Sequence, residues 1–181
     1  MGKGLEIEVK YRLKPGQREA IAQALTGMEA ERSEQEDQYY EVGDRVLRIR
    51  CENGRWLLTR KDRFQLTPEG TKIRPEVEVP IPDAFVSDLE ALILWLGHEK
   101  LTRVRKIREA YQVEGVTVAL DHIEGLSDEF AEFEVLSDRP DAAAKLTGLR
   151  ERFGLTDEQV ELSSYARLVA EAGGGDVNGR E

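Results

Sequence analysis

The first clear pattern in the chain is an alternation of apolar and charged residues near its N-terminus. Between residues 5 and 13, Glu6, Glu8 and Lys10 fall on one side of the alternation, whereas Ile7 and Val9 fall on the other. A repeat of two residues is typical of a β-strand, because successive side chains point to opposite faces of the sheet. Residues 5–13 are therefore predicted to form a strand with one charged face and one apolar face.

The same period of two returns along most of the chain. Asn53-Gly54 is a strong hairpin signal between two such segments, and Glu114-Gly115 marks a second tight turn. Pro75 lies inside another segment and indicates an edge strand or a bulge, because proline has no N–H for the ladder. After the first strand, the predicted strands are residues 39–42, 46–50, 56–61, 71–79, 101–113, 116–123 and 130–136.

Four other segments are predicted to be helical, and the first of them carries an apolar stripe at Ile21, Leu25 and Met28. These segments are residues 17–28, 82–95, 141–153 and 156–172. Strands outnumber helices and most connections are hairpins, which favours an α+β fold: an antiparallel sheet or barrel with helices packed outside. We expect one domain over residues 1–172 with Trp56 and Trp95 in its core, and a disordered tail over residues 173–181.

Composition narrows the class of protein. The 181 residues carry a formal net charge of -10, which argues against a nucleic-acid binder because such proteins are basic. The single cysteine, Cys51, allows no internal disulfide, and no apolar run is long enough to span a bilayer. We therefore expect a soluble, cytoplasmic protein without a nucleic-acid or membrane partner.

Charged faces recur on strand after strand, and this recurrence needs an explanation. A single charged face would simply point to water, as in an ordinary antiparallel sheet. If instead a barrel closed with these faces inward, carboxylates would suit Mg²⁺ or Mn²⁺, and arginine and lysine would suit phosphate oxygens. The basic members are Lys10, Arg48, Arg50, Lys61, Arg74, Lys106 and Arg108, and the acidic members are Glu6, Glu8, Glu76, Glu78, Asp121, Glu132 and Glu134.

Eight ordered segments resemble the CYTH family of triphosphate tunnel metalloenzymes, which includes thiamine triphosphatases and class IV adenylyl cyclases. The ExExK motif of that family is present as Glu6-Ile7-Glu8-Val9-Lys10. Matching segments follow in order at residues 37–40, 47–50, 58–61, 74–78, 106–111, 120–126 and 132–134, with Ser164-Tyr165 after them. The resemblance covers roughly residues 5–168.

This resemblance implies an eight-stranded antiparallel β-barrel whose tunnel holds a triphosphate and one or two Mg²⁺ or Mn²⁺ ions. The implied catalytic residues are Glu6, Glu8, Lys10 and Glu134. The implied metal ligands are Glu6, Glu8, Asp121, Glu132 and Glu134, with Glu76 and Glu78 binding metal or positioning water. The implied phosphate ligands are Lys10, Arg48, Arg50, Lys61, Arg74, Lys106 and Arg108. Tyr165 is expected either to reach the tunnel or to pack in a helix.

Three functions fit these residues. The first is a metal-dependent hydrolase of inorganic triphosphate, thiamine triphosphate or a nucleoside triphosphate, the second is an adenylyl cyclase, and the third is a non-catalytic polyphosphate binder. Class IV cyclases resemble one another in a His-Phe segment before the Asp-x-Tyr-Tyr stretch, where residues 32–37 read Arg-Ser-Glu-Gln-Glu-Asp. This departure favours the hydrolase. The expected partner is a small-molecule triphosphate, and formation of a homodimer is left open.

Overall fold

The computed structural model describes residues 4–137 and 142–173. Nine strands are present in this part of the chain: β1 Gly4–Arg12, β2 Glu31–Tyr40, β3 Val46–Glu52, β4 Arg55–Lys61, β5 Gln65–Leu66, β6 Lys72–Ile81, β7 Lys100–Val113, β8 Val116–Ile123 and β9 Glu129–Leu136. The helices are α1 Gln17–Ala24, α2 Val86–Trp95, α3 Ala142–Arg152 and α4 Tyr165–Ala172, with short 3₁₀ turns η1 Asp83–Phe85 and η2 Asp157–Gln159.

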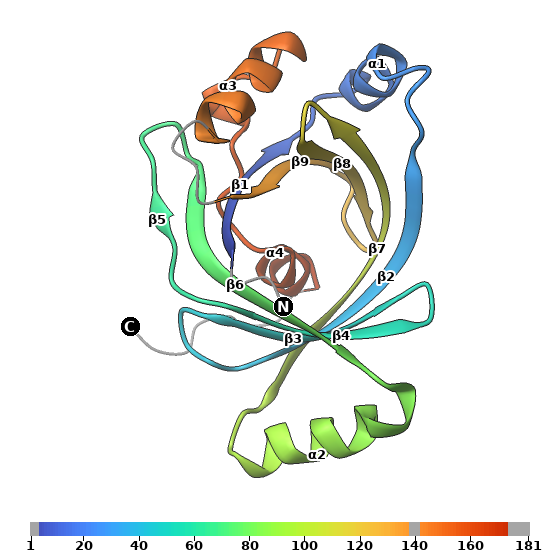
Figure 1. Cartoon of the computed structure of the whole chain (residues 1–181), viewed down its shortest axis with the longest axis vertical. Helices are drawn as coiled ribbons and strands as arrows, with labels where there is room; N and C mark the ends of the chain where they lie inside the picture. The colour runs from blue at the N-terminus through green and yellow to red at the C-terminus, as the bar shows by residue number, and fades with distance from the viewer. Residues whose placement is uncertain (1–3, 138–141, 174–181) are drawn as a thin grey trace.

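Eight of the strands close into a barrel. They are hydrogen-bonded in the order β1-β9-β8-β7-β2-β3-β4-β6, and pairing of β1 with β6 closes the ring. Every neighbouring pair is antiparallel, and the two-residue strand β5 pairs with β6. Figure 1 looks into this ring, with α1, α2 and α3 around it and α4 within its outline. The predicted eight-stranded antiparallel barrel of an α+β fold is therefore confirmed.

Strand β6 closes the barrel, so of the two alternatives predicted from Pro75, an edge strand or a bulge, the edge strand is wrong. β6 pairs with β1 on one side and with β4 and β5 on the other. The carbonyl of Pro75 accepts a hydrogen bond from the backbone N–H of Asp62 at 3.0 Å, just beyond the end of β4. The position without a backbone N–H therefore falls at the break between β4 and β5, where few ladder hydrogen bonds are lost.

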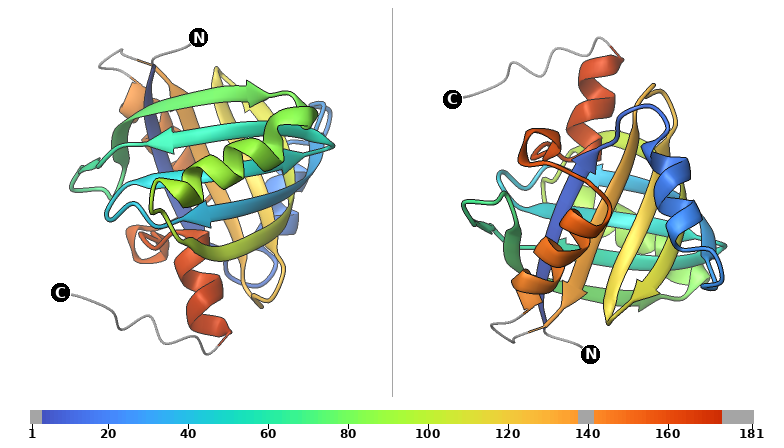
Figure 2. Two further views of the ribbon diagram at one scale, coloured as in Figure 1. Left: turned by 90° about the horizontal axis from the view of Figure 1, so that it is seen from below. Right: turned by 90° about the horizontal axis from the view of Figure 1, so that it is seen from above.

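The apolar faces of the strands point outward and are covered by helices. Ile21 in α1, Leu25 directly after it, and Leu146 in α3 join the buried cluster that contains Val9 and Phe133. On another side of the barrel, α2 packs through Ile93 against residues of β2, β3 and β4. Figure 2 shows α1, α2 and α3 lying on the outer surface of the barrel. Because helices bury the apolar faces, the charged faces are left to fill the interior.

The C-terminal segment departs from the predicted helix over residues 156–172. After η2, the backbone N–H of Glu161 donates to the carbonyl of Lys10 at 2.8 Å, and Val160 forms a bridge with Tyr11. These bonds to β1 replace helical bonds, so residues 160–164, which we call the strap, are not helical. Ser164 then caps α4, which stands at one end of the barrel in Figure 2.

Several boundaries also differ from the sequence predictions. Strand β2 begins at Glu31 rather than at residue 39, because its polar residues alternate between the interior and the outer surface. Trp95 is 80% exposed and lies outside the core, whereas Trp56 packs beside α2. Helix α1 ends at Ala24 rather than at residue 28, and β5 lies between the strands predicted at residues 56–61 and 71–79. The predicted tail at residues 173–181 lies, except for Gly173, outside the described residues. In the described ranges no helix is long and apolar enough to cross a membrane.

Candidate active site

The inward faces of the strands enclose a cavity of about 160 Å³. All seven predicted phosphate ligands line it, and an eighth cation, Lys72, joins them although the sequence analysis did not select it. Five predicted acidic residues also line the cavity: Glu8, Glu76, Glu78, Glu132 and Glu134. Glu6 and Asp121 lie behind this lining and are fully buried. The cavity wall therefore carries eight cations against five carboxylates, an arrangement suited to a polyanion.

Three carboxylates meet near the start of β1. Each of Glu6, Glu76 and Glu134 offers one oxygen, and these three oxygens lie within 4.8 Å of one another. They converge because β1 pairs with β6 on one side and with β9 on the other. An all-oxygen donor set of this kind suits a hard divalent cation such as Mg²⁺ or Mn²⁺.

Two cations, Lys61 and Arg74, lie against this carboxylate cluster. The Lys61 ammonium contacts Glu6 and lies 3.2 Å from a carboxylate oxygen of Glu76. The Arg74 Nε atom donates to Glu6 Oε2 at 2.7 Å, and its Nη2 atom reaches Glu8 Oε2 at 3.3 Å. Burial opposes ionisation of Glu6, but Lys61 and Arg74 outweigh it and lower the pKa of Glu6 to about 2.

The neighbouring carboxylates behave in the opposite way. Burial, together with the charges of Glu6, Glu8 and Glu76, raises the pKa of Glu134 to about 7 despite Lys61. Burial and the adjacent charge of Glu6 also raise the pKa of Glu8, and burial raises the pKa of Glu76 although Lys61 opposes it. Although cations outnumber carboxylates over the whole cavity wall, the group of Glu6, Glu8, Glu76 and Glu134 is contacted by only two of the described cations, Lys61 and Arg74. A divalent ion fits this local excess of carboxylates.

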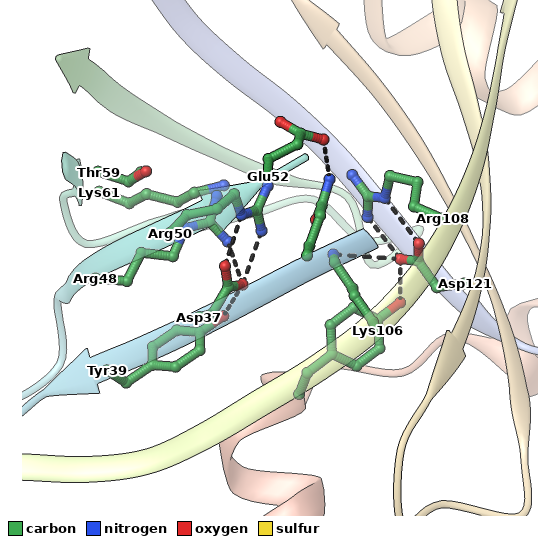
Figure 3. A network of polar contacts seen from close by, with 12 residues as sticks. Asp37, Tyr39, Arg48, Arg50, Glu52, Thr59, Lys61, Lys106, Arg108 and Asp121 are labelled. Carbon is green, nitrogen blue, oxygen red and sulfur yellow. Dashed lines mark hydrogen bonds and ion pairs between the residues drawn. The ribbon is translucent and has the colours of Figure 1, made fainter. Parts of the chain in front are cut away.

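Asp37 holds two of the arginines that line the cavity, and the sequence analysis did not select it as a site residue. Its carboxylate accepts from Arg50 Nε at 2.6 Å and Arg50 Nη2 at 2.8 Å, and from Arg48 Nη1 at 3.3 Å (Figure 3). Burial favours the neutral acid, but Arg48 and Arg50 hold the pKa of Asp37 well below its usual range. The alternation of β2 could have placed Asp37 inside the barrel, since Ser33 and Gln35 on the same face are buried too.

Asp121 plays a similar part on the other side of the barrel. It accepts two hydrogen bonds from Arg108, at 2.7 and 2.6 Å, and one from the Tyr165 hydroxyl at 2.9 Å. Lys106 lies 3.6 Å away (Figure 3), and Glu132 also contacts Arg108. Both Asp121 oxygens are thus engaged by cations, and Asp121 is not part of the three-carboxylate cluster.

Lys106 and Tyr165 complete this side of the cavity. Burial and the nearby Arg108 charge lower the pKa of Lys106 to about 8, although Asp121 favours its charged form. The Lys106 ammonium lies 5.0 Å from the centroid of the Tyr165 ring, and the Lys10 ammonium lies 4.2 Å from it. Of the two roles expected for Tyr165, the structure therefore shows that it reaches the interior.

A closed antiparallel barrel with a charged interior defines the class of triphosphate tunnel folds. The family model of the CYTH domain matches residues 4–165, and the chain belongs to the CYTH family. Members of this family are enzymes, either adenylyl cyclases or triphosphatases, that act on small-molecule triphosphates with the help of divalent metal ions.

Individual relatives agree with this assignment. Adenylate cyclase CyaB of Aeromonas hydrophila is 29% identical and aligns with 92% of this chain and 90% of its own length. The PH1819 protein of Pyrococcus horikoshii OT3 is 33% identical, with a TM-score of 0.77 over 92% of this chain and 98% of that one. HpAC1 of Hippeastrum, described as having a dominant triphosphatase activity, is 22% identical with a TM-score of 0.67 over 96% of this chain and 98% of its own, which shows a shared fold.

Proposed function

We propose that this protein is a metal-dependent triphosphatase that hydrolyses the terminal phosphoryl group of a triphosphate inside the barrel. The observation that carries the proposal is the composition of the cavity wall. Apart from Ser164, its non-ionic residues are Tyr39, Val46, Leu136 and Tyr165, whereas eight cations surround the space. Such a wall recognises the phosphate chain and offers little apolar surface to a purine base.

The arginines that would bind the phosphates are already held in place by buried carboxylates of the barrel. Arg48 and Arg50 are fixed by Asp37, and Arg108 is fixed by Asp121. Pre-organised guanidinium groups of this kind stabilise negative charge without having to reorganise during the reaction. Phosphoryl transfer depends mainly on such positioning and charge neutralisation.

The carboxylate cluster of Glu6, Glu76 and Glu134 would hold the divalent ion, with Glu8 beside it. When bound, Mg²⁺ or Mn²⁺ would polarise phosphate oxygens and make water a better nucleophile. In the proposed reaction, water adds to the terminal phosphorus and the bridging P–O bond breaks. The water proton passes to a cavity carboxylate, and for inorganic triphosphate the products are phosphate and diphosphate. Lys10 would contact the phosphate chain further along β1.

Adenylyl cyclase activity is the second candidate, and the full-length similarity to CyaB favours it. The same wall could hold the triphosphate of ATP while the ribose 3′-hydroxyl attacks and diphosphate leaves. A segment typical of class IV cyclases is replaced here by residues 32–37 of β2, where Gln35 and Asp37 face the interior. A third candidate, a non-catalytic polyphosphate binder, would have no need for so many carboxylates.

One panel of reactions separates the three candidates. Inorganic triphosphate, thiamine triphosphate and ATP are each incubated with Mg²⁺ or Mn²⁺, and phosphate, diphosphate and cyclic AMP are measured. The proposal expects release of phosphate, abolished in the Glu8→Ala variant. Exclusive production of cyclic AMP from ATP would overturn it in favour of the cyclase, and binding without turnover by wild type would favour the binder.

A further inference from the structure

Helix α2 is apolar on two sides, and only one of them packs against the barrel. On the inner side, Ile93 is buried among residues of β2, β3 and β4. Four large apolar side chains on the other side are exposed: Phe85 by 59%, Leu92 by 50%, Trp95 by 80% and Leu96 by 59%. They follow one another by whole helical turns and so share one side of the helix, which we call the α2 patch. A helix that is apolar all round is normally buried all round.

No described element covers the α2 patch. The left view of Figure 2 shows α2 across the front of β3 and β4, with no other helix or strand over it. Residues 1–3, 138–141 and 174–181, which lie outside the described ranges, include only three apolar side chains, Met1, Pro140 and Val177. These offer too little apolar surface to cover two aromatic rings and two leucines. The α2 patch is therefore open to another molecule.

The size of the α2 patch fits one half of a stable protein interface. At about 150–250 Å² for a buried aromatic side chain and less for a leucine, its four side chains offer roughly 300–500 Å². Ala91 and Leu94 are exposed on the same helix and enlarge this area. A standard interface buries about 800 Å² on each partner, and about 65% of a homodimer interface is apolar, which is roughly 500 Å². The patch thus reaches the apolar area that one subunit of a dimer needs.

The layout of the α2 patch suits pairing with itself. An isologous dimer joins the same surface of two copies across a twofold axis, so that surface must complement itself. The patch has an aromatic ring near each end, Phe85 and Trp95, and Leu92 lies between them. Two antiparallel α2 helices would bring Phe85 of one copy against Leu96 of the other. The two helix dipoles then point in opposite directions, which is the favourable arrangement.

A lipid surface matches the α2 patch less well. Amphipathic helices that lie on membranes are rich in lysine and arginine on their polar face. Helix α2, Val86–Trp95, contains Asp88 and Glu90 and no basic residue. The formal net charge of -10 also opposes contact with anionic lipids.

We propose that a second copy of this chain covers the α2 patch, so that the protein is a homodimer joined through antiparallel α2 helices. This interface lies on the outer surface of the barrel. The cavity of each copy is lined by residues of its own strands and of Ser164 and Tyr165. Each copy therefore keeps a complete site, and the dimer does not depend on the proposed hydrolysis.

Analytical ultracentrifugation of wild type, Leu92→Glu and the control Met28→Glu tests the dimer. Met28 is 42% exposed, close to Leu92, and follows α1, which lies far from α2 in Figures 1 and 2. Wild type at about 10–100 µM should have twice the 20.5 kDa mass of one chain, because interfaces of standard size bind with micromolar or higher affinity. An unpaired carboxylate in the interface should raise the dissociation constant of Leu92→Glu at least about a hundredfold. Met28→Glu should dimerise as wild type does.

Iodide quenching of tryptophan fluorescence gives a second readout on wild type alone, which decides the matter if circular dichroism shows that Leu92→Glu does not fold. Quenching should weaken as the protein concentration rises and the Trp95 indole becomes covered. Strong quenching at every concentration would overturn the proposal. So would a wild type of single-chain mass at about 100 µM, whether it stays free or floats with vesicles of phosphatidylcholine and phosphatidylglycerol. A folded Leu92→Glu protein that still dimerises like wild type would show that another surface joins the copies, and would overturn it too.

Discussion

Replacing Asp37 by asparagine should destabilise the ligand-free protein strongly. Asp37 is 1% exposed and is the carboxylate that Arg50 contacts, so the substitution leaves two arginines without their buried counter-charge. Removing one partner of a buried ion pair costs about 3–5 kcal/mol. At the lower figure, and at 2–4 °C per kcal/mol for a domain of this size, the unfolding temperature should fall by about 6–12 °C.

Thermal unfolding followed by circular dichroism measures this loss, and Glu36→Gln provides a matched control. Glu36 precedes Asp37 on β2 but lies outside the barrel, where it pairs with Arg103 and Arg105 at a side-chain exposure of 39%. Its replacement should cost no more than about 1 kcal/mol. Saturating inorganic triphosphate should restore part of the stability of Asp37→Asn, because phosphate can replace the lost carboxylate. Equal, small losses in the two variants would refute the role assigned to Asp37.

Four further predictions concern Glu134, Tyr165 and helix α2. Because the pKa of Glu134 is raised to about 7, binding of a metal ion below that pH should release a proton from Glu134. The affinity for Mn²⁺, measured by calorimetry, should therefore rise with pH up to about pH 7 and then level off. An affinity that does not change with pH would contradict this. In metal-free protein this raised pKa means that the stability from Glu134 declines between pH 4.5 and about 7, since the folded state keeps a proton that the unfolded chain releases. Tyr165→Phe removes the hydrogen bond to Asp121 and should cost about 1.5–3 kcal/mol in urea unfolding, and an unchanged midpoint would argue against that bond. In dilute, monomeric protein, Trp95→Ser should change the free energy of unfolding by less than about 0.5 kcal/mol, whereas Ile93→Ala in the same helix should lower it by about 2–5 kcal/mol. Similar losses in the two variants would show that a partner covers the exposed indole even at that dilution.

The strands of the barrel could be predicted because their alternation is strong. Glu6, Glu8 and Lys10 alternate with apolar residues so regularly that only a strand explains them, and β8 has the predicted bounds. The choice between an inward and an outward charged face needed the recurrence of this pattern on many strands. Resemblance to the CYTH family then implied that seven cations bind phosphate, and all seven line the cavity.

Other features depend on contacts between distant residues, which a local pattern does not encode. The strap interrupts a segment with helical character because Glu161 finds a hydrogen-bond partner on β1, 151 positions earlier, at Lys10. Asp37 opens the matching segment at residues 37–40, but nothing in that segment shows that it pairs with Arg48 and Arg50. Lys72 has no distinctive local motif, and it joins the cavity lining only because the barrel closes. Trp95 was placed in the core by its size alone, although α2 turns its Ile93 side inward.

The most direct test of the proposed function is an analysis of the products formed from ATP with Mg²⁺ or Mn²⁺. Phosphorus NMR resolves phosphate, diphosphate and ADP in one spectrum, and cyclic AMP is measured in the same sample by chromatography. The proposed triphosphatase predicts that any ATP consumed appears as ADP and phosphate, with inorganic triphosphate cleaved to phosphate and diphosphate. Cyclic AMP and diphosphate as the sole products from ATP, with inorganic triphosphate left intact, would contradict it.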